Sequence, residues 1–98
     1  SMPPFSRLIS IIISSKSENL LYDVCYNLLE KFPRYKDVKI LGPAPAPLSF
    51  LRGRYRNRFL IKSPKNTFSQ DIVKSWIENT KIPKQIRISI DVDPYTFS

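Results

Sequence analysis

The chain has 98 residues, of which 42% are hydrophobic, and it carries a net charge of +8 with no histidine and one cysteine. A chain of this length makes one domain with a modest core, and no apolar run approaches the roughly 18 residues of a membrane span. The composition excludes an internal disulfide, a multi-cysteine zinc site and histidine-based catalysis, and a lone cysteine fits a reducing, cytoplasmic compartment.

The N-terminal part of the sequence divides into a leader and a strand. We interpret residues 1–6 as an expression scar and a linker from a preceding domain, and residues 7–98 as the domain itself. Arg7–Ser14 alternates with a period of two, which is typical of a strand. Leu8 and Ile12 make its outer face partly apolar, as expected of a central strand. The inward residues are predicted to be Ile9, Ile11 and Ile13.

The next segment, Glu18–Phe32, has the spacing of an amphipathic helix. Ser17 can cap its first turn, and Pro33 helps to end it. Cys25 lies near the apolar stripe, so we expect a small buried hydrophobe rather than a reactive thiol. The stripe consists of Leu20, Leu21, Val24, Leu28, Leu29 and Phe32.

A proline-rich segment follows a short predicted strand at Asp37–Leu41. Alternate prolines cannot sit in a central ladder, and they favour an extended, stiff chain. The segment is therefore either a rigid connector or a site where a partner peptide docks. The three prolines are Pro43, Pro45 and Pro47.

Arg54–Lys62 is the third predicted strand, and it is the most basic one. Period-two alternation places Tyr55, Phe59 and Ile61 on one face, which should pack against the helices. The opposite face combines Leu60 with four cations, and we expect it to be open to solvent. These cations are Arg54, Arg56, Arg58 and Lys62.

The second helix is predicted at Gln70–Thr80, with Ser69 as its cap and Phe68 stapled against Val73. Its buried stripe includes Trp76, which we assign to the core rather than to base stacking. The stripe consists of Ile72, Val73, Trp76 and Ile77.

Ile86–Val92 is the last predicted strand, with Ile86, Ile88, Ile90 and Val92 inward. The order β-α-β-β-α-β predicts an α+β, ferredoxin-like fold: a four-stranded, mainly antiparallel sheet with two helices on one face. The other face is left open. The alternation places six cations there: Lys39, Arg54, Arg56, Arg58, Lys62 and Arg87.

Positive charge is concentrated in the middle of the chain. Residues 34–62 hold eight Lys or Arg against one acid, so they carry +7 of the total +8. Charge clustered in this way predicts a binding site for a polyanion such as a nucleic acid. Three or four phosphate contacts would give a slope of log affinity against log salt of roughly −2 to −4. The alternative is a solvated basic edge without a partner.

Catalytic motifs are absent from the sequence. The only glycines are Gly42 and Gly53, so the chain has no nucleotide-phosphate loop. Asp91 and Asp93 share a strand face, but two carboxylates at the end of an exposed strand are usually solvated rather than metal-bound. We therefore expect no metal and no enzymatic activity for this chain by itself.

Three blocks of sequence resemble a known family. They are Gly42-Pro43-Ala44-Pro45-Ala46-Pro47-Leu48, then Arg52-Gly53-Arg54-Tyr55-Arg56, and finally Ile90-Asp91-Val92-Asp93-Pro94. In this order they are similar to the C-terminal domain of the bacterial primosomal protein N′ family, the PriA replication-restart helicases. Pro3-Pro4-Phe5 resembles the family's segment where the second helicase lobe passes into this domain.

The resemblance implies a parent that is an ATP-dependent 3′→5′ DNA helicase of replication restart. Its ATP, magnesium and zinc sites would lie in segments outside this chain, so no cofactor is expected here. The expected partners are branched and single-stranded DNA, bound without sequence preference, single-stranded DNA-binding protein and other primosome proteins. No membrane is expected as a partner, and the domain is expected to be a monomer.

The resemblance also supplies candidate site residues. Arg52, Arg54, Tyr55 and Arg56 fall in the family's basic block, and strand alternation adds Arg58, Lys62, Lys39 and Arg87 as DNA contacts. Asn57 departs from relatives that have an aromatic within this stretch, which argues against base stacking. As the alternative function, the domain would dock the acidic tail of single-stranded DNA-binding protein, with Lys65 and Gln70 as its contacts near the second helix start.

Overall fold

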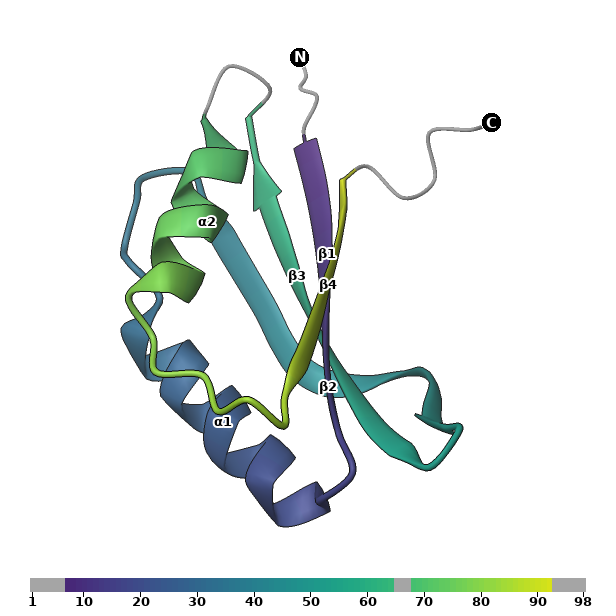
Figure 1. The fold of residues 1–98 in the computed structure, drawn as a ribbon. Coiled ribbons are helices and arrows are strands. Elements are labelled where there is room, and N and C mark those ends of the chain that lie inside the picture. The colour runs from purple at the N-terminus through teal and green to yellow at the C-terminus, as the bar shows by residue number, and fades with distance from the viewer. Residues whose placement is uncertain (1–6, 65–67, 93–98) are drawn as a thin grey trace.

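The computed structural model describes residues 7–64 and 68–92, so the predicted leader 1–6, Lys65 and Asp93 lie outside the described residues. Four strands and two helices alternate along these residues (Figure 1). They are β1 (Arg7–Ser15), α1 (Glu18–Lys31), β2 (Lys39–Leu51), β3 (Arg54–Ser63), α2 (Ser69–Glu78) and β4 (Arg87–Val92).

The strands form one sheet in the order β2-β3-β1-β4, and every neighbouring pair is antiparallel. Both helices lie against the same face of this sheet, which leaves the opposite face open (Figure 1). The arrangement confirms the predicted α+β, ferredoxin-like class. Neither helix of the described residues is long and apolar enough to cross a membrane.

Strand β1 forms the centre of the sheet and of the core. Three of its alternate residues, Ile9, Ile11 and Ile13, are fully buried beneath the helices. The predicted alternation is therefore confirmed, and it fixes which face of every neighbouring strand is covered. Cys25 of α1 is also buried, where the Asn57 amide donates to its sulfur at 3.7 Å, as expected for a packing residue.

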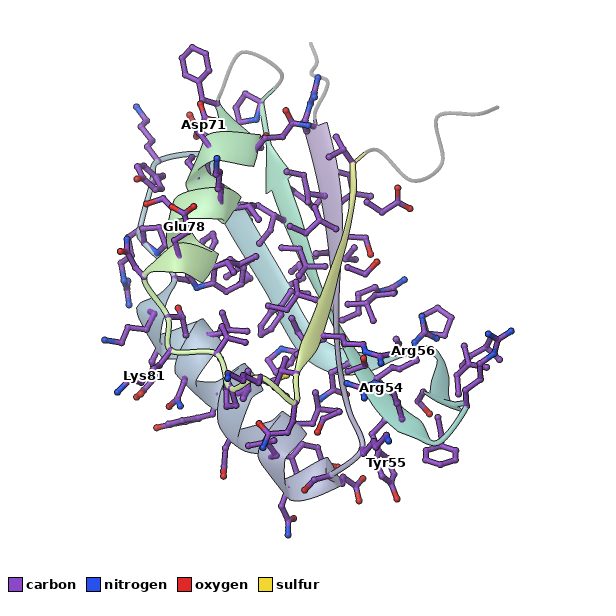
Figure 2. The ribbon with its side chains drawn as sticks, viewed as in Figure 1. Arg54, Tyr55, Arg56, Asp71, Glu78 and Lys81 are labelled. Carbon is purple, nitrogen blue, oxygen red and sulfur yellow. The ribbon has the colours of Figure 1, made fainter. Side chains whose placement is uncertain are left out.

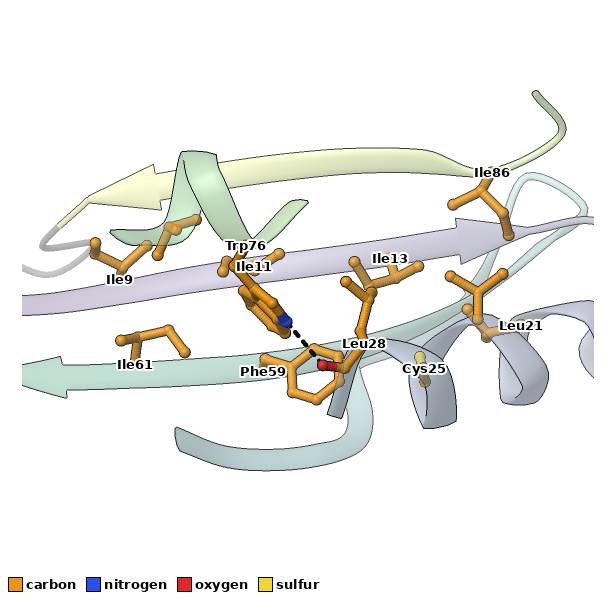
Figure 3. Close-up of a cluster of buried hydrophobic side chains, with 12 residues drawn as sticks. Ile9, Ile11, Ile13, Leu21, Cys25, Leu28, Phe59, Ile61, Trp76 and Ile86 are labelled. Carbon is orange, nitrogen blue, oxygen red and sulfur yellow. Dashed lines mark hydrogen bonds between the residues drawn. The ribbon is translucent and has the colours of Figure 1, made fainter. Parts of the chain in front are cut away.

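Trp76 joins the two helices to the sheet (Figure 3). Its indole Nε1 donates a 2.7 Å hydrogen bond to the carbonyl of Leu28 in α1. Its ring meets Phe32 and Phe59 edge to face, with centroids 4.9 and 5.5 Å apart. The core assignment is confirmed, because both the ring and its one polar group are satisfied inside the protein.

Helix α1 begins where the sequence predicts. The Ser17 hydroxyl accepts a hydrogen bond from the backbone N–H of Leu20 at 3.2 Å, which confirms the cap. The helix ends at Lys31, one residue before the predicted end. Leu29 was assigned to the buried stripe, yet 40% of its surface is exposed because it lies at the margin of the stripe.

The proline-rich segment is part of the sheet, and its assignment as a connector outside the sheet is wrong. Strand β2 runs over Lys39–Leu51, far beyond the predicted end at Leu41, and its pairing with β3 shifts twice. Because β2 is an edge strand, one side of its backbone needs no partner, and prolines are tolerated there. Pairing resumes between the shifts at Ala44 and Pro45.

Helix α2 begins one residue earlier than predicted, and the predicted cap is wrong. It spans Ser69–Glu78 rather than Gln70–Thr80, and Phe68 occupies the capping position without a side-chain hydrogen bond. Ser69 is buried as the first helical residue, so its hydroxyl is directed into the protein. The staple onto Val73 is also wrong, because 78% of the Phe68 surface is exposed.

Strand β4 begins at Arg87, one residue after the predicted start at Ile86, and forms the second edge of the sheet. Ile90 was predicted to be buried, but 49% of its surface is exposed. The residue has the correct parity for the helix-covered face. An edge strand has a neighbour on one side only, and the cover above Ile90 is incomplete.

Candidate nucleic-acid interface

The register places all six predicted outward cations on the open side of the sheet. Arg58 lies opposite Ile12, Lys62 opposite Leu8, and Arg87 opposite Ser14, and these β1 residues alternate with the buried ones. Figure 2 shows Arg54 and Arg56 on the side of the sheet away from the helices, whereas Lys81 lies on the side of the helices. We call this surface the basic face: Lys39, Arg54, Arg56, Arg58, Lys62 and Arg87.

Two of these cations face each other directly. Lys39 on β2 and Lys62 on β3 are cross-strand partners, and both are exposed. Like charges in this position destabilise a sheet by up to about 1 kcal/mol. No described residue supplies a side-chain hydrogen bond or an ion pair to either lysine. The pair therefore presents two uncompensated charges to any anion that approaches the open face.

Arg54 has a structural role that the sequence did not reveal. Its Nε donates to the Ser14 hydroxyl at 3.0 Å, and its Nη2 donates to the carbonyls of Ser14 and Gln85, each at 2.9 Å. These bonds join β3, the end of β1 and the loop before β4. These acceptors are uncharged, so they fix the position of the guanidinium without supplying a counter-charge.

Arg56 performs a similar task at the β2–β3 hairpin. Its Nη1 donates to the carbonyls of Pro47 and Leu48 at 2.7 and 2.8 Å. Leu48 has a φ of 54°, a left-handed conformation that is uncommon for a leucine. The arginine ties the β2 arm to β3 at this point.

The predicted basic block thus contains two kinds of cation. Arg54 and Arg56 hold backbone carbonyls, whereas Arg58 and Arg87, like the lysine pair, make no side-chain hydrogen bond or ion pair to the described residues. The second kind is available to an external anion without breaking an internal bond. Sequence reasoning could not separate the two kinds, because the acceptors are backbone groups distant along the chain.

Apolar side chains lie between the cations of the open face. Leu60 is opposite Ser10 on β1 and Leu41 on β2, and Ile12 lies opposite Arg58. Leu41 exposes 48% of its surface. The face therefore combines an apolar floor with basic side chains, a combination suited to a ligand that has both apolar and anionic parts.

The remaining residues of the predicted DNA site lie at or near the hairpin. Arg52 is exposed in the turn, with a φ of 52°. Tyr55 has the parity of the helix-covered face, as the alternation predicts. Its ring packs against Phe50 with centroids 4.8 Å apart. Tyr55 is thus not part of the open face, and stacking of a base on the open sheet would have to use other side chains.

The second predicted site, for a protein tail, is only partly described. Gln70 is exposed in the first turn of α2 and lies at an apolar cleft between α2 and β4. The cleft has a volume of about 440 Å³ and is bounded by Val73, Ile77 and Ile90, with one charged residue of each sign, Lys74 and Glu78, at its wall. Among the described residues, no group of three or more Cys, Asp or Glu side chains could hold a metal ion.

Comparison with known proteins identifies the family. Residues 1–95 match the family described as "Primosomal protein N C-terminal domain". The chain belongs to this family. It is 44% identical over 97 residues to the replication restart protein PriA of Rickettsia typhi and 31% identical over 96 residues to that of Treponema pallidum. These alignments cover 99% and 94% of the chain but 15% and 14% of the relatives.

The chain therefore spans about one seventh of the length of the PriA relatives that it matches, and it corresponds to their C-terminal domain. Among solved structures, the de novo designed protein Foldit4 has a similar fold, with a TM-score of 0.58 at 12% identity, covering 89% of this chain and 97% of that one.

Proposed function

We propose that this chain is a DNA-binding accessory domain of a replication-restart helicase. Membership of the PriA C-terminal domain family, whose relatives are named replication restart protein PriA, supports the role in replication restart. The basic face supports binding through phosphates, which positions a protein on DNA without reading its sequence. The observation that carries the proposal is the group of uncompensated cations, Lys39, Lys62 and Arg58, on the same open face.

The chemistry of this face favours the single-stranded and branched parts of a replication fork. A single strand offers both unpaired base surfaces and phosphates, and such strands bind where a basic groove adjoins surfaces that accept bases. Leu60 and Leu41 would contact the bases while the neighbouring lysines meet the phosphates. The same family membership supports a parent protein that works with other primosome proteins in the cytoplasm.

The test compares two pairs of charge removals in the 98-residue chain. Arg58→Ala with Lys62→Ala removes two cations from the basic face, and Lys31→Ala with Lys81→Ala removes two exposed lysines from the helix side. Binding to a synthetic fork and to a single strand is measured across salt concentrations. We expect the first variant to flatten the slope for the single strand by about 1.4, at about 0.7 per phosphate contact, and the control to leave it unchanged.

Folding must be verified separately for each variant, by circular dichroism and by the fluorescence of the buried Trp76. If both variants are folded and give the same affinity and the same salt slope as the parent chain, the open face does not bind DNA. Equal losses in both variants would mean that only net charge matters, and the assignment to this face would then be wrong.

A second candidate function is docking of the acidic tail of single-stranded DNA-binding protein. The observation that favours it is the apolar cleft between α2 and β4, beside Gln70 and Lys74. A tail that ends in apolar residues and carries acidic ones would place the former in the cleft and the latter near the lysine. Titration with the tail peptide should shift the amide signals of Gln70 and Lys74 but not that of Arg58; shifts confined to the basic face would count against docking here.

A further inference from the structure

A basic cavity lies at one end of the sheet, and its lining includes Arg54 and Arg87, two of the residues predicted to bind DNA. It has a volume of about 440 Å³ and lies where β1 leads into α1 and where the loop after α2 enters β4. Four of its eight lining residues are cations, and none is acidic. The lining residues are Ser15, Lys16, Ser17, Leu20, Arg54, Lys84, Gln85 and Arg87.

The four cations reach the cavity from separate parts of the chain. Lys16 follows β1, Arg54 begins β3, and Lys84 and Arg87 flank the entry into β4. No described side chain forms an ion pair with any of them. Positive charges gathered without counter-charges repel one another, and a bound anion relieves that repulsion.

Arg54 is the preorganised member of the group. Its Nε and Nη2 are occupied by Ser14 and Gln85, and no described residue accepts a hydrogen bond from Nη1. The bound carbonyls fix the plane of the guanidinium, so little side-chain entropy remains to be lost when Nη1 meets a ligand. The N–H groups of Nη1 remain able to donate charge-assisted hydrogen bonds to phosphate oxygens.

The wall formed by Ser17 adds neutral donors. Its hydroxyl oxygen accepts from the backbone N–H of Leu20, which leaves the hydroxyl hydrogen for another acceptor. Helix α1, with fourteen residues, begins at this wall, and its dipole favours an anion there. These groups add to the four cations, which supply the positive charge of the cavity.

We propose that this cavity binds one phosphate group of the DNA strand that lies on the basic face. The inference rests on the proposed function, and it extends the path of the strand. Arg54 and Arg87 belong both to the basic face and to the cavity lining. A strand crossing the open face past Arg58 thus reaches the cavity at its end, where Lys16 and Lys84 close around a phosphate from the far side.

The experiment uses the 98-residue chain with two lysines changed, Lys16→Gln and Lys84→Gln. Both side chains are exposed and neither belongs to the basic face, so the fold and that face stay intact. The matched control is Lys31→Gln with Lys81→Gln, which removes the same charge from exposed positions outside the cavity. Arg54 is left unchanged because it also holds backbone carbonyls.

Two ligands, oligothymidylate and inorganic phosphate, are titrated while backbone amide shifts and affinity are recorded. We expect oligothymidylate to shift the amides of Lys16, Ser17 and Gln85 in the parent and in the control. In the cavity variant these shifts should be lost, and the salt slope should be shallower by about 1.4. Inorganic phosphate should shift the same amides more weakly, because it lacks the contacts of the rest of the strand.

The possible results separate this inference from the proposed function. If the cavity variant binds oligothymidylate like the control while the Arg58→Ala, Lys62→Ala variant is weakened, the cavity proposal is wrong and the basic face stands. If the cavity variant alone is weakened, the open-face assignment fails, and with it the proposed path of the strand from that face into the cavity. If inorganic phosphate shifts these amides but oligothymidylate does not, the cavity is a site for free phosphate, and its assignment to DNA is overturned.

Discussion

Gly42 and Gly53 provide a matched test of how the β2–β3 pair is built. Both glycines have positive φ angles, 105° and 79°. A Cβ added at Gly42 would lie 2.6 Å from the backbone carbonyl oxygen of Arg58, whereas a Cβ at Gly53 would meet no atom within 4 Å. Gly42 also lies between Leu41 and Ala44, where the register shifts and the two backbones approach closely. The same substitution, Gly→Ala, therefore meets different obstacles at the two sites.

The expected losses of folding free energy in the two variants follow from these geometries. A positive φ costs an alanine about 1–3 kcal/mol at either site, partly offset by about 0.4–1 kcal/mol because alanine restricts the unfolded chain. Only Gly42→Ala must also push a backbone carbonyl aside, which costs about a further 1–3 kcal/mol. We expect Gly42→Ala to be less stable than Gly53→Ala by that last amount, a large part of the roughly 5–15 kcal/mol of a typical domain.

The measurement is urea and thermal unfolding followed by the fluorescence of Trp76, the only tryptophan, which lies in the core. For a domain of this size, each kcal/mol corresponds to about 4–8 °C in the melting temperature. The two variants should thus melt several degrees apart. Equal melting temperatures would refute the reasoning, since they would mean that β2 and β3 do not approach each other closely at Gly42.

Two further predictions concern Arg56 and Cys25. Arg56→Ala should lower the free energy of unfolding by about 1–2 kcal/mol and speed amide exchange in the hairpin, because two carbonyls of β2 lose a charged donor. Arg58→Ala is the control, and it should change neither the stability nor the exchange. Equal effects of the two substitutions would contradict the conclusion that Arg56, but not Arg58, holds the hairpin. Burial raises the pKa of the Cys25 thiol. Its reaction with a thiol reagent at pH 8 should therefore be slow in the native chain and fast in urea. Rapid labelling of the native chain would show that the side chain is accessible. Since the folded pKa is the higher one, Cys25 should also reduce stability as pH rises above the unfolded value of about 9.

Local signals in the sequence were sufficient for most of the fold. The alternation of Ile9, Ile11 and Ile13 located the central strand and its buried face, and the helical spacing around Trp76 located a core residue. Ser17 was recognisable as a cap because its partner lies three residues away. Such features depend on neighbours along the chain, and their order in the sequence then restricts the topology to few choices.

The features that were missed depend on neighbours in space. The tolerance of β2 for prolines requires an edge position, which a single strand does not reveal. The acceptors of Arg54 are a residue of β1 and the carbonyl of Gln85. The cavity brings Lys16 beside Lys84 from distant parts of the sequence. The charge pattern thus predicted the basic face. It did not predict which of its cations bond to backbone carbonyls, or that a basic cavity lies at the end of that face.

The prolines of β2 also affect how the molecule meets copies of itself. An exposed sheet edge offers unpaired N–H and C=O groups that can recruit a strand from another chain, which is a common origin of aggregation. Three of the N–H groups along β2 are missing, because Pro43, Pro45 and Pro47 have none. Addition of a strand from another chain is therefore disfavoured along β2. The β4 edge is left as the edge of the sheet at which such a strand can pair.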